Sequence, residues 1–305
     1  MALFCFLPGV DSYTRTGCRS KPSYNPAAEI QQSRQHKEAS AGQDFFQSQR
    51  ASDYAKSPHS VKYIVSLQTS KGQHFCAGTL VHKYWVLTAA HCNTGCLALR
   101  VDQMMIVAGD NFLGKYEGME QYSKPYSITP HPLYNKSTSN ADIMLIKLRA
   151  PIKLNRYVSL APLPKQNTGV LPGRLCQVYD WSPTRQGRGV SLLTLHSVTL
   201  PITSTAKCNS SRSYNGSITS NMICAGYSTG GKDACKWDAG ELLVCDGRLY
   251  GFASWGNIRR VTGLPGVYTA VARFRRWIDR TIYRSFTRCY KYRNPLASKS
   301  TSSDV

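Results

Sequence analysis

Three short segments carry residues whose types could do proton-transfer chemistry. They are Thr88-Ala89-Ala90-His91-Cys92, Asn140-Ala141-Asp142-Ile143, and Asp233-Ala234-Cys235-Lys236-Trp237-Asp238-Ala239-Gly240-Glu241-Leu242. An imidazole takes up a proton near neutral pH, and a neighbouring carboxylate can orient it, so His91 and Asp142 could work as a pair. A histidine or aspartate taken alone is more often structural, so the order and context of the segments carry the argument.

In this order, the three segments resemble the histidine, aspartate and serine motifs of the trypsin-like serine proteases of the chymotrypsin fold. The resemblance runs from about Tyr63 to about Tyr283. It implies an all-β protein of two packed six-stranded antiparallel β-barrels with a C-terminal α-helix. It also implies that His91 is the general base and that Asp142 is the buried carboxylate that orients it. We expect no cofactor.

The third segment departs from the family motif, which is D-x-C-x-G-D-S-G-G-P. Ala239 occupies the serine position, so His91 has no hydroxyl to deprotonate and no acyl-enzyme can form. Losing that serine from a working triad costs about 10⁶ in turnover. Trp237 replaces the glycine whose N–H stabilises the oxyanion, and losing one such donor costs about 10²–10³. The resemblance therefore predicts a protease fold without protease chemistry.

The substrate pocket of the family is largely kept. Asp233 matches the carboxylate at the pocket floor that selects arginine or lysine side chains. The walls match Ser254-Trp255-Gly256 on one side and a segment that contains Gly266 on the other. Glycines matter there because a Cβ would intrude on a long cationic side chain. We expect this pocket to bind a basic side chain weakly.

The activation site of the family is altered. In the family, cleavage frees an Ile-Val-Gly-Gly terminus whose amine pairs with the acid before the serine, here Asp238. A cut after Arg50 would instead expose Ala51. We therefore expect the pocket and oxyanion loops to resemble those of an unactivated zymogen.

Eleven cysteines favour an oxidising compartment. The resemblance implies the disulfides Cys76–Cys92, Cys176–Cys245 and Cys208–Cys224. Cys235 is expected to be unpaired, because the segment 256–265 that should supply its partner contains no cysteine. Cys5, Cys18, Cys96 and Cys289 have no assigned partner. No Cys/His set has metal-ligand spacing, so we expect no metal site.

Export is inferred from the cysteines and the resemblance. The apolar run from Met1 to Pro8 has no basic residue before it and no small-residue cleavage site beside it. We nevertheless expect an extracellular protein. Glycosylation sequons begin at Asn135, Asn209 and Asn215 and could be modified in an exported chain.

The chain divides by composition into three parts. Residues 1–50 are polar and predict a disordered segment, residues 51–286 form the trypsin-like domain, and residues 287–305 form a basic and polar tail. Within the domain, short β-prone runs predict strands at 61–67, 85–88, 104–108, 142–148, 175–179 and 244–253. Helical spacing of apolar residues predicts one helix from Val271 to Ser285. No run approaches the roughly 20 apolar residues of a membrane span.

The formal charge is +21, from 38 basic and 17 acidic residues. Residues 259–293 hold ten basic residues and one acid, Asp279. Such a cluster attracts polyanions, among them heparin-like polysaccharides, anionic bacterial surfaces and nucleic acid. No nucleic-acid motif accompanies the charge, so we do not expect that partner. The alternative is a solvated basic helix that only aids solubility.

These features favour a catalytically inactive homologue that acts by binding. Its expected partners are peptides or protease inhibitors with arginine or lysine side chains, or heparin-like polyanions, and we expect a monomer. The rival hypothesis is an active trypsin-like endopeptidase whose sequence is wrong at 236–242 and at the N-terminus. Resequencing the transcript across both regions separates the two, because a G-D-S-G-G-P motif there would favour the rival.

Overall fold

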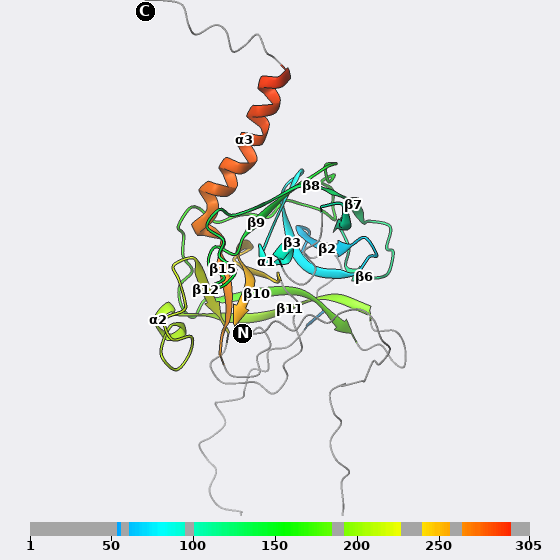
Figure 1. The fold of residues 1–305 in the computed structure, drawn as a ribbon. Coiled ribbons are helices and arrows are strands. Elements are labelled where there is room, and N and C mark those ends of the chain that lie inside the picture. The colour runs from blue at the N-terminus through cyan, green and yellow to red at the C-terminus, as the bar shows by residue number, and fades with distance from the viewer. Residues whose placement is uncertain are drawn as a thin grey trace, which may run out of the picture. The chain divides into compact units, whose positions relative to one another are not determined.

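Short strands separated by tight turns make up most of the described chain. The computed structural model describes residues 54–55, 61–94, 101–184, 192–226, 240–256 and 264–293 (Figure 1). The predicted polar segment 1–50 lies outside these ranges. The strands form two antiparallel sheets, the first from residues 64–148 and the second mainly from residues 175–270.

The first sheet closes into a barrel through one bent strand. Its order is β7-β5-β2-β3-β4-β9-β8. The outer strands β7 and β8 are separated only by Lys124 and form one continuous run. The first part of this run pairs with β5 and the second part pairs with β9, which closes the barrel. Counting that run once gives six strands. The strands are β2 (Ile64–Thr69), β3 (His74–His82), β4 (Trp85–Thr88), β5 (Met104–Ala108), β7 (Gln121–Ser123), β8 (Pro125–Pro130) and β9 (Met144–Leu148).

The second sheet closes because β11 pairs with both β10 and β12. Its ring runs β11-β10-β13-β14-β15-β12, and the short strands β1 and β6 add to β11 outside the ring. The strands are β1 (Tyr54–Ala55), β6 (Phe112–Leu113), β10 (Leu175–Thr184), β11 (Leu192–Thr203), β12 (Met222–Ala225), β13 (Leu242–Cys245), β14 (Arg248–Gly256) and β15 (Gly266–Ala270). The predicted pair of six-stranded barrels is confirmed.

One predicted strand is wrong. The run 244–253 was expected to be a single strand, but it is a hairpin of β13 and β14. Asp246 and Gly247 form the turn, with φ of +49° and +72°. An Asp-Gly pair with two positive φ angles is a favoured hairpin turn because its twist matches that of the flanking strands. The apolar and aromatic residues on both sides of the turn favour strand, so the whole run was predicted as one strand.

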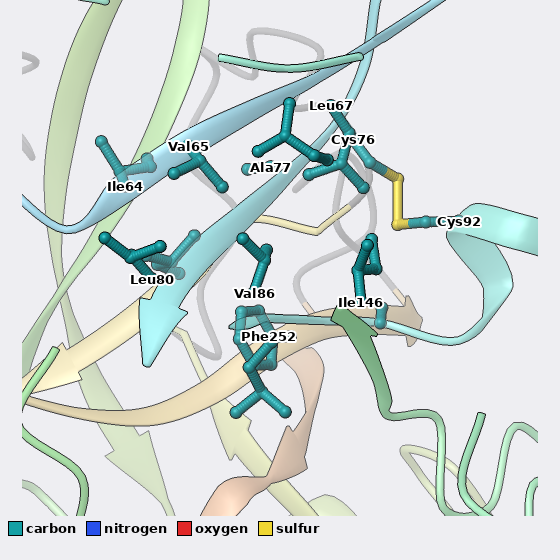
Figure 2. Packing of buried hydrophobic residues seen from close by; sticks show 14 of the residues in the cluster. Ile64, Val65, Leu67, Cys76, Ala77, Leu80, Val86, Cys92, Ile146 and Phe252 are labelled. Carbon is teal, nitrogen blue, oxygen red and sulfur yellow. A yellow bond between two sulfur atoms is a disulfide. The ribbon is translucent and has the colours of Figure 1, made fainter. Parts of the chain in front are cut away.

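The core is continuous between the two barrels. Val65 and Val86 of the first barrel and Phe252 of the second are fully buried in one cluster. Figure 2 shows these side chains among the packed residues, with Val86 above Phe252 and the Cys76–Cys92 disulfide to one side of them. The described domain therefore behaves as one packed unit, and the residues between the barrels are held by both.

Helices are few and short except at the C-terminal end. They are α1 (His91–Thr94), η2 (Val101–Gln103), α2 (Thr205–Cys208), η3 (Val271–Phe274) and α3 (Arg275–Arg293). His131 contacts both Phe274 and Trp277 with ring centroids 4.9 Å apart, which packs the start of α3 against the first barrel. Figure 1 shows the remainder of α3, in orange and red, extending away from the strands. No helix in the described ranges is long and apolar enough to cross a membrane.

The C-terminal helix differs from its prediction at both ends. Its first turn, Val271–Phe274, is a 3₁₀ turn, and the α-helix then continues to Arg293 instead of ending at Ser285. Val271, Phe274, Ile278 and Ile282 are buried, as their spacing predicts. Between Val271 and Pro295 the sequence has no glycine or proline to end the helix earlier, and proline disfavours helical backbone in the residue before it. The predicted tail from 287 thus begins as helix.

Candidate functional site

His91 is placed by the end of β4 and by a disulfide. It is the first residue of α1, three residues after β4 ends at Thr88. The Thr88 hydroxyl donates to the Ala77 carbonyl at 2.7 Å, and the Cys76–Cys92 disulfide joins β3 to α1. Both links tie the His91 segment to β3, so the imidazole is carried on a fixed backbone.

Asp142 is fully buried and collects several hydrogen bonds. Its Oδ1 accepts from the His91 backbone N at 2.8 Å, and its Oδ2 lies 2.7 Å from His91 Nδ1. The Ser254 hydroxyl donates to the same Oδ2, and the Thr269 hydroxyl donates to the Asp142 carbonyl at 2.9 Å. A buried carboxylate is stable only with such donors around it. The second barrel thus supplies two of the groups that hold the aspartate of the first.

The turn before Asp142 has an unusual backbone. Ser139 and Ala141 both have positive φ, of +52° and +54°. Between them, Asn140 accepts hydrogen bonds through Oδ1 from Thr219 Oγ1 at 2.9 Å and from Asn221 Nδ2 at 3.1 Å. Left-handed backbone at residues other than glycine costs free energy and persists where surrounding contacts enforce it. Here the enforcing contacts join the turn to the second barrel.

The His91 imidazole could accept a proton from a hydroxyl group, but no such hydroxyl is hydrogen-bonded to it among the described residues. With Nδ1 facing Asp142, the other ring nitrogen of His91, Nε2, is the atom left for a substrate. Among the residues that the structure describes, none forms a hydrogen bond to that nitrogen. The hydroxyls of Ser254 and Thr269 are both engaged with Asp142. Neither is placed to act as a nucleophile.

Strands β14 and β15 bring the expected pocket walls side by side in one sheet. Gly256 pairs with Gly266, and Trp255 pairs with Val267. Gly256 has φ of +89°, and a Cβ there would lie 2.5 Å from the Tyr214 hydroxyl oxygen. The walls were expected to need glycine to admit a ligand. At Gly256, the structure adds a reason within the protein, because Tyr214 already occupies that space.

Tyr214 was not foreseen from the sequence. Its ring lies edge-on to Trp255 with centroids 4.9 Å apart, and its hydroxyl donates to the Pro265 carbonyl at 2.5 Å. It therefore braces both walls. Pro265 is 51 residues away in the chain, and no local pattern marks Tyr214 as a partner.

The third sequence segment lies almost wholly outside the described residues. Asp233, Cys235, Trp237, Asp238 and Ala239 all fall there, so the pocket floor, the oxyanion position and the nucleophile position remain expectations. Gly240, which follows these residues, faces the Ala77 backbone so closely that a Cβ would lie 2.6 Å from the Ala77 carbonyl oxygen. Glu241 is buried where the family motif has glycine.

All three expected disulfides are present. Cys76 bonds to Cys92, Cys176 to Cys245, and Cys208 to Cys224. Each closes a loop and so limits the conformations of the unfolded chain. Cys5, Cys18 and Cys96 lie outside the described residues, and so does the side chain of Cys289.

An acidic cluster in the first barrel was also missed. Asp110, Glu117 and Glu120 place carboxylate oxygens within 4.8 Å of one another. Burial and the charges of Glu120 and Glu117 raise the pKa of Asp110 to about 7. Three oxygen donors are the kind of set that hard cations such as Ca²⁺ take. The three acids are spread over eleven residues without a regular ligand spacing, so the sequence alone did not indicate them.

Comparison with known proteins agrees with the fold. The family model described as Trypsin matches residues 52–278. The chain is 40% identical to "Trypsin" of Xenopus laevis over 223 residues, which are 73% of this chain and 86% of that protein. It is 40% identical to "Trypsin-3" of Salmo salar over 73% and 89% of the two chains, and 38% identical to "Trypsin" of Sus scrofa over 75% and 94%. A match over most of the chain, on two closed barrels with these disulfides, shows that the protein belongs to the trypsin family of serine proteases.

Proposed function

We propose that this protein is a trypsin-family homologue that binds the ligands of its ancestors without hydrolysing them. The observation that carries the proposal is the contrast between an assembled His91–Asp142 pair and the alanine at position 239. An imidazole with its orienting carboxylate still needs a hydroxyl to deprotonate before it can start acyl transfer. The tryptophan at 237 adds a second obstacle, because the oxyanion donor there needs a permissive backbone.

Recognition of a basic side chain is the binding mode that we favour. The braced walls of β14 and β15 support it, since Tyr214 holds both Trp255 and the Pro265 carbonyl. Asp233 in the sequence would supply the carboxylate that pairs with a cation. The expected partners are peptides or protease inhibitors that present arginine or lysine. The disulfides favour an oxidising, extracellular setting for them.

Two measurements test this function. Turnover of an arginine peptide ester by the full chain after trypsin treatment, with the trypsin then inhibited, should show no burst of product. A burst that disappears in the His91→Ala variant would overturn the proposal.

Calorimetric titration with a small arginine amide should show weak binding that is lost in Asp233→Asn and kept in Asp246→Asn, which removes an exposed acid elsewhere. Equal binding by both variants would contradict the pocket.

A second mode, polyanion binding, is favoured by one specific observation. Four exposed arginines surround a groove of about 460 Å³ at the start of α3. Its lining residues include no acid and are Pro132, Gln166, Arg273, Arg276, Trp277, Arg280, Thr281 and Arg284. Like charges four residues apart on a helix repel one another, so an anion that bridges them would relieve this repulsion.

The contacts of each arginine indicate which of them fit the polyanion mode. Arg275 bonds to Asp279 at 2.9 Å and to the Pro164 carbonyl at 3.2 Å, so its charge is matched by the one acid of the helix. Arg273 instead contacts neutral groups, the Ser220 carbonyl and Asn167 Oδ1. We therefore assign the polyanion site to Arg273, Arg276, Arg280 and Arg284, and exclude Arg275.

Salt elution from heparin tests the polyanion mode. A basic residue near an anionic surface contributes about 1 kcal/mol, so glutamine at all four groove arginines should weaken binding by roughly a hundredfold or more. The matched control replaces four exposed lysines outside the groove, Lys62, Lys71, Lys124 and Lys153, by glutamine. Equal losses in the two variants would show that only net charge matters, and would remove the groove from the proposal.

A further inference from the structure

Three sequons occur in the chain, and the structure gives them different surroundings. They are Asn135-Lys136-Ser137, Asn209-Ser210-Ser211 and Asn215-Gly216-Ser217. Transfer of an oligosaccharide needs the Asn Nδ2 and the hydroxyl two residues later to reach one enzyme, which requires an accessible and bent segment. Accessibility and the hydrogen bonds of each Asn therefore separate the three.

The first sequon is exposed and already bent. Asn135, Lys136 and Ser137 are all exposed. Asn135 Oδ1 accepts from the Ser137 N at 2.9 Å and from the Thr138 N at 3.1 Å, which makes an Asx-turn. Both bonds use Oδ1, so Nδ2, the atom that carries a glycan, takes no part in them.

The third sequon is at the tip of a tight loop. Asn215, Gly216 and Ser217 are all exposed, and the first two have φ of +42° and +81°. The Ser217 N donates to the Tyr214 carbonyl at 3.0 Å, and the Asn215 N to the Ser210 carbonyl at 3.0 Å. Asparagine tolerates positive φ better than other side chains, so this turn presents the sequon without requiring the loop to unfold.

The second sequon is held inside the base of that same loop. Asn209 caps the end of α2, next to the buried Cys208, and is partly buried. Its Oδ1 accepts from the Ile218 N at 2.8 Å, and its carbonyl accepts from the Gly216 N at 3.1 Å. Partial burial at the base of the loop limits the access of the transferring enzyme to Nδ2, whereas the other two asparagines are exposed. We therefore expect no glycan on Asn209.

Hydrogen bonds and a ring contact connect the loops of the two exposed sequons to each other and to the Trp255 wall of the pocket. The Asn135 N donates to the Asn140 carbonyl at 3.0 Å, and the Asn140 side chain bonds to Thr219, two residues beyond the Ser217 loop. Tyr214, directly before Asn215, contacts Trp255. Glycans at Asn135 and Asn215 would therefore stand beside the same wall.

We propose that Asn135 and Asn215 carry N-linked oligosaccharides, that Asn209 does not, and that the two glycans slow the approach of folded proteins to the Trp255 wall, protease inhibitors included, while small ligands reach it unhindered. The shielding half rests on the proposed peptide-binding function. The donor is a lipid pyrophosphate-linked oligosaccharide. The bond from its first sugar C1 to the pyrophosphate breaks, C1 bonds to Nδ2, Nδ2 loses one proton, and the lipid pyrophosphate leaves.

Site occupancy is tested by mass spectrometry on the full chain made in animal cells behind a cleavable secretion signal. Alanine at the third sequon position removes each site while leaving its asparagine in place. Wild type and Ser211→Ala should carry two glycans, Ser137→Ala and Ser217→Ala one each, and the Ser137→Ala/Ser217→Ala double variant none. A glycan on Asn209, or an unmodified Asn135 or Asn215 in the secreted protein, would overturn the assignment.

Shielding is tested on the same protein before and after enzymatic removal of its glycans. The association rate of a folded inhibitor domain with an exposed arginine loop should rise at least several-fold on removal, whereas that of a small arginine amide should not change. Equal rates before and after would refute shielding. Failure of both probes to bind in either form would refute the proposed function, and the masses would still decide the glycan sites.

Discussion

Ser254 donates its hydroxyl proton to Asp142 Oδ2, the oxygen that also faces His91 Nδ1. The two residues are 112 positions apart and come from different barrels. The aspartate of the first barrel is therefore held by a strand of the second. The hydrogen bond therefore joins the two barrels at a fully buried carboxylate, which gives it a role in the stability of the fold.

Ser254→Ala should lower the free energy of unfolding by about 1–3 kcal/mol. The change leaves a fully buried carboxylate with one donor fewer, and hydrogen bonds to charged groups are worth about that amount. Chemical denaturation at neutral pH measures the loss. Ser220→Ala, at an exposed serine, is the matched control and should change stability by less than about 0.5 kcal/mol. A similar effect in both variants would contradict the assigned role of the Ser254–Asp142 bond.

Restoring the serine alone should not restore a normal enzyme. Ala239→Ser supplies the hydroxyl, but Trp237 still occupies the oxyanion position. The double variant Ala239→Ser/Trp237→Gly should therefore exceed the single variant by about 10²–10³ in kcat on an arginine ester. Adding His91→Ala should abolish the gain. If the single variant matches the double variant, tryptophan at 237 is not an obstacle.

Gly240→Ala should destabilise the domain by roughly 3 kcal/mol or more. Gly240 has φ of +88°, and a Cβ there would lie 2.6 Å from the Ala77 carbonyl oxygen, so strain and overlap add. Gly72→Ala is the matched control, because Gly72 has φ of +76° with no atom near its Cβ position. It should cost only about 1–2 kcal/mol. Equal thermal shifts in the two variants would show that contact with Ala77 is unimportant.

Asp110→Asn should raise stability at pH 8 and have less effect at pH 5. The folded-state pKa of Asp110 is raised to about 7, well above the usual range of an aspartate, mainly by burial and then by the charges of Glu120 and Glu117. The folded state therefore binds the proton more tightly, and stability is lost as the pH rises from about 4 through about 7. With discounting for the partial exposure of this carboxyl, we expect a gain of about 1–2 kcal/mol.

The Asp110 measurement is a pair of denaturation curves at pH 5 and pH 8, with a chelator present so that no cation binds the cluster. Asp246→Asn is the control, since Asp246 is exposed and its acid group forms an ion pair with Arg174 on the surface. A stability difference that does not depend on pH would contradict a raised pKa at Asp110.

The family motifs predicted the fold because their residues carry local constraints. The run around His91 places an imidazole after a strand and beside a half-cystine. In the structure, His91 begins a helix, Cys92 forms the expected disulfide, and Asp142 is the buried partner of the imidazole. Apolar spacing likewise predicted the buried face of the C-terminal helix. Where a short-range rule was overlooked, the prediction failed, as at the Asp246-Gly247 turn that splits one expected strand into β13 and β14.

The sequence by itself determined the barrel architecture, the disulfides, and the absence of a serine at 239, since each depends on residue identity or short spacing. Only the tertiary structure decided that Tyr214 braces both pocket walls, that Arg273, Arg276, Arg280 and Arg284 line one groove while Arg275 pairs with Asp279, and that Asn209 is partly buried while Asn135 and Asn215 are exposed. Those relationships join residues distant along the chain or depend on which way a loop turns. Packing between the barrels and hydrogen bonds across loops determine these relationships. Neither can be predicted from a local sequence pattern.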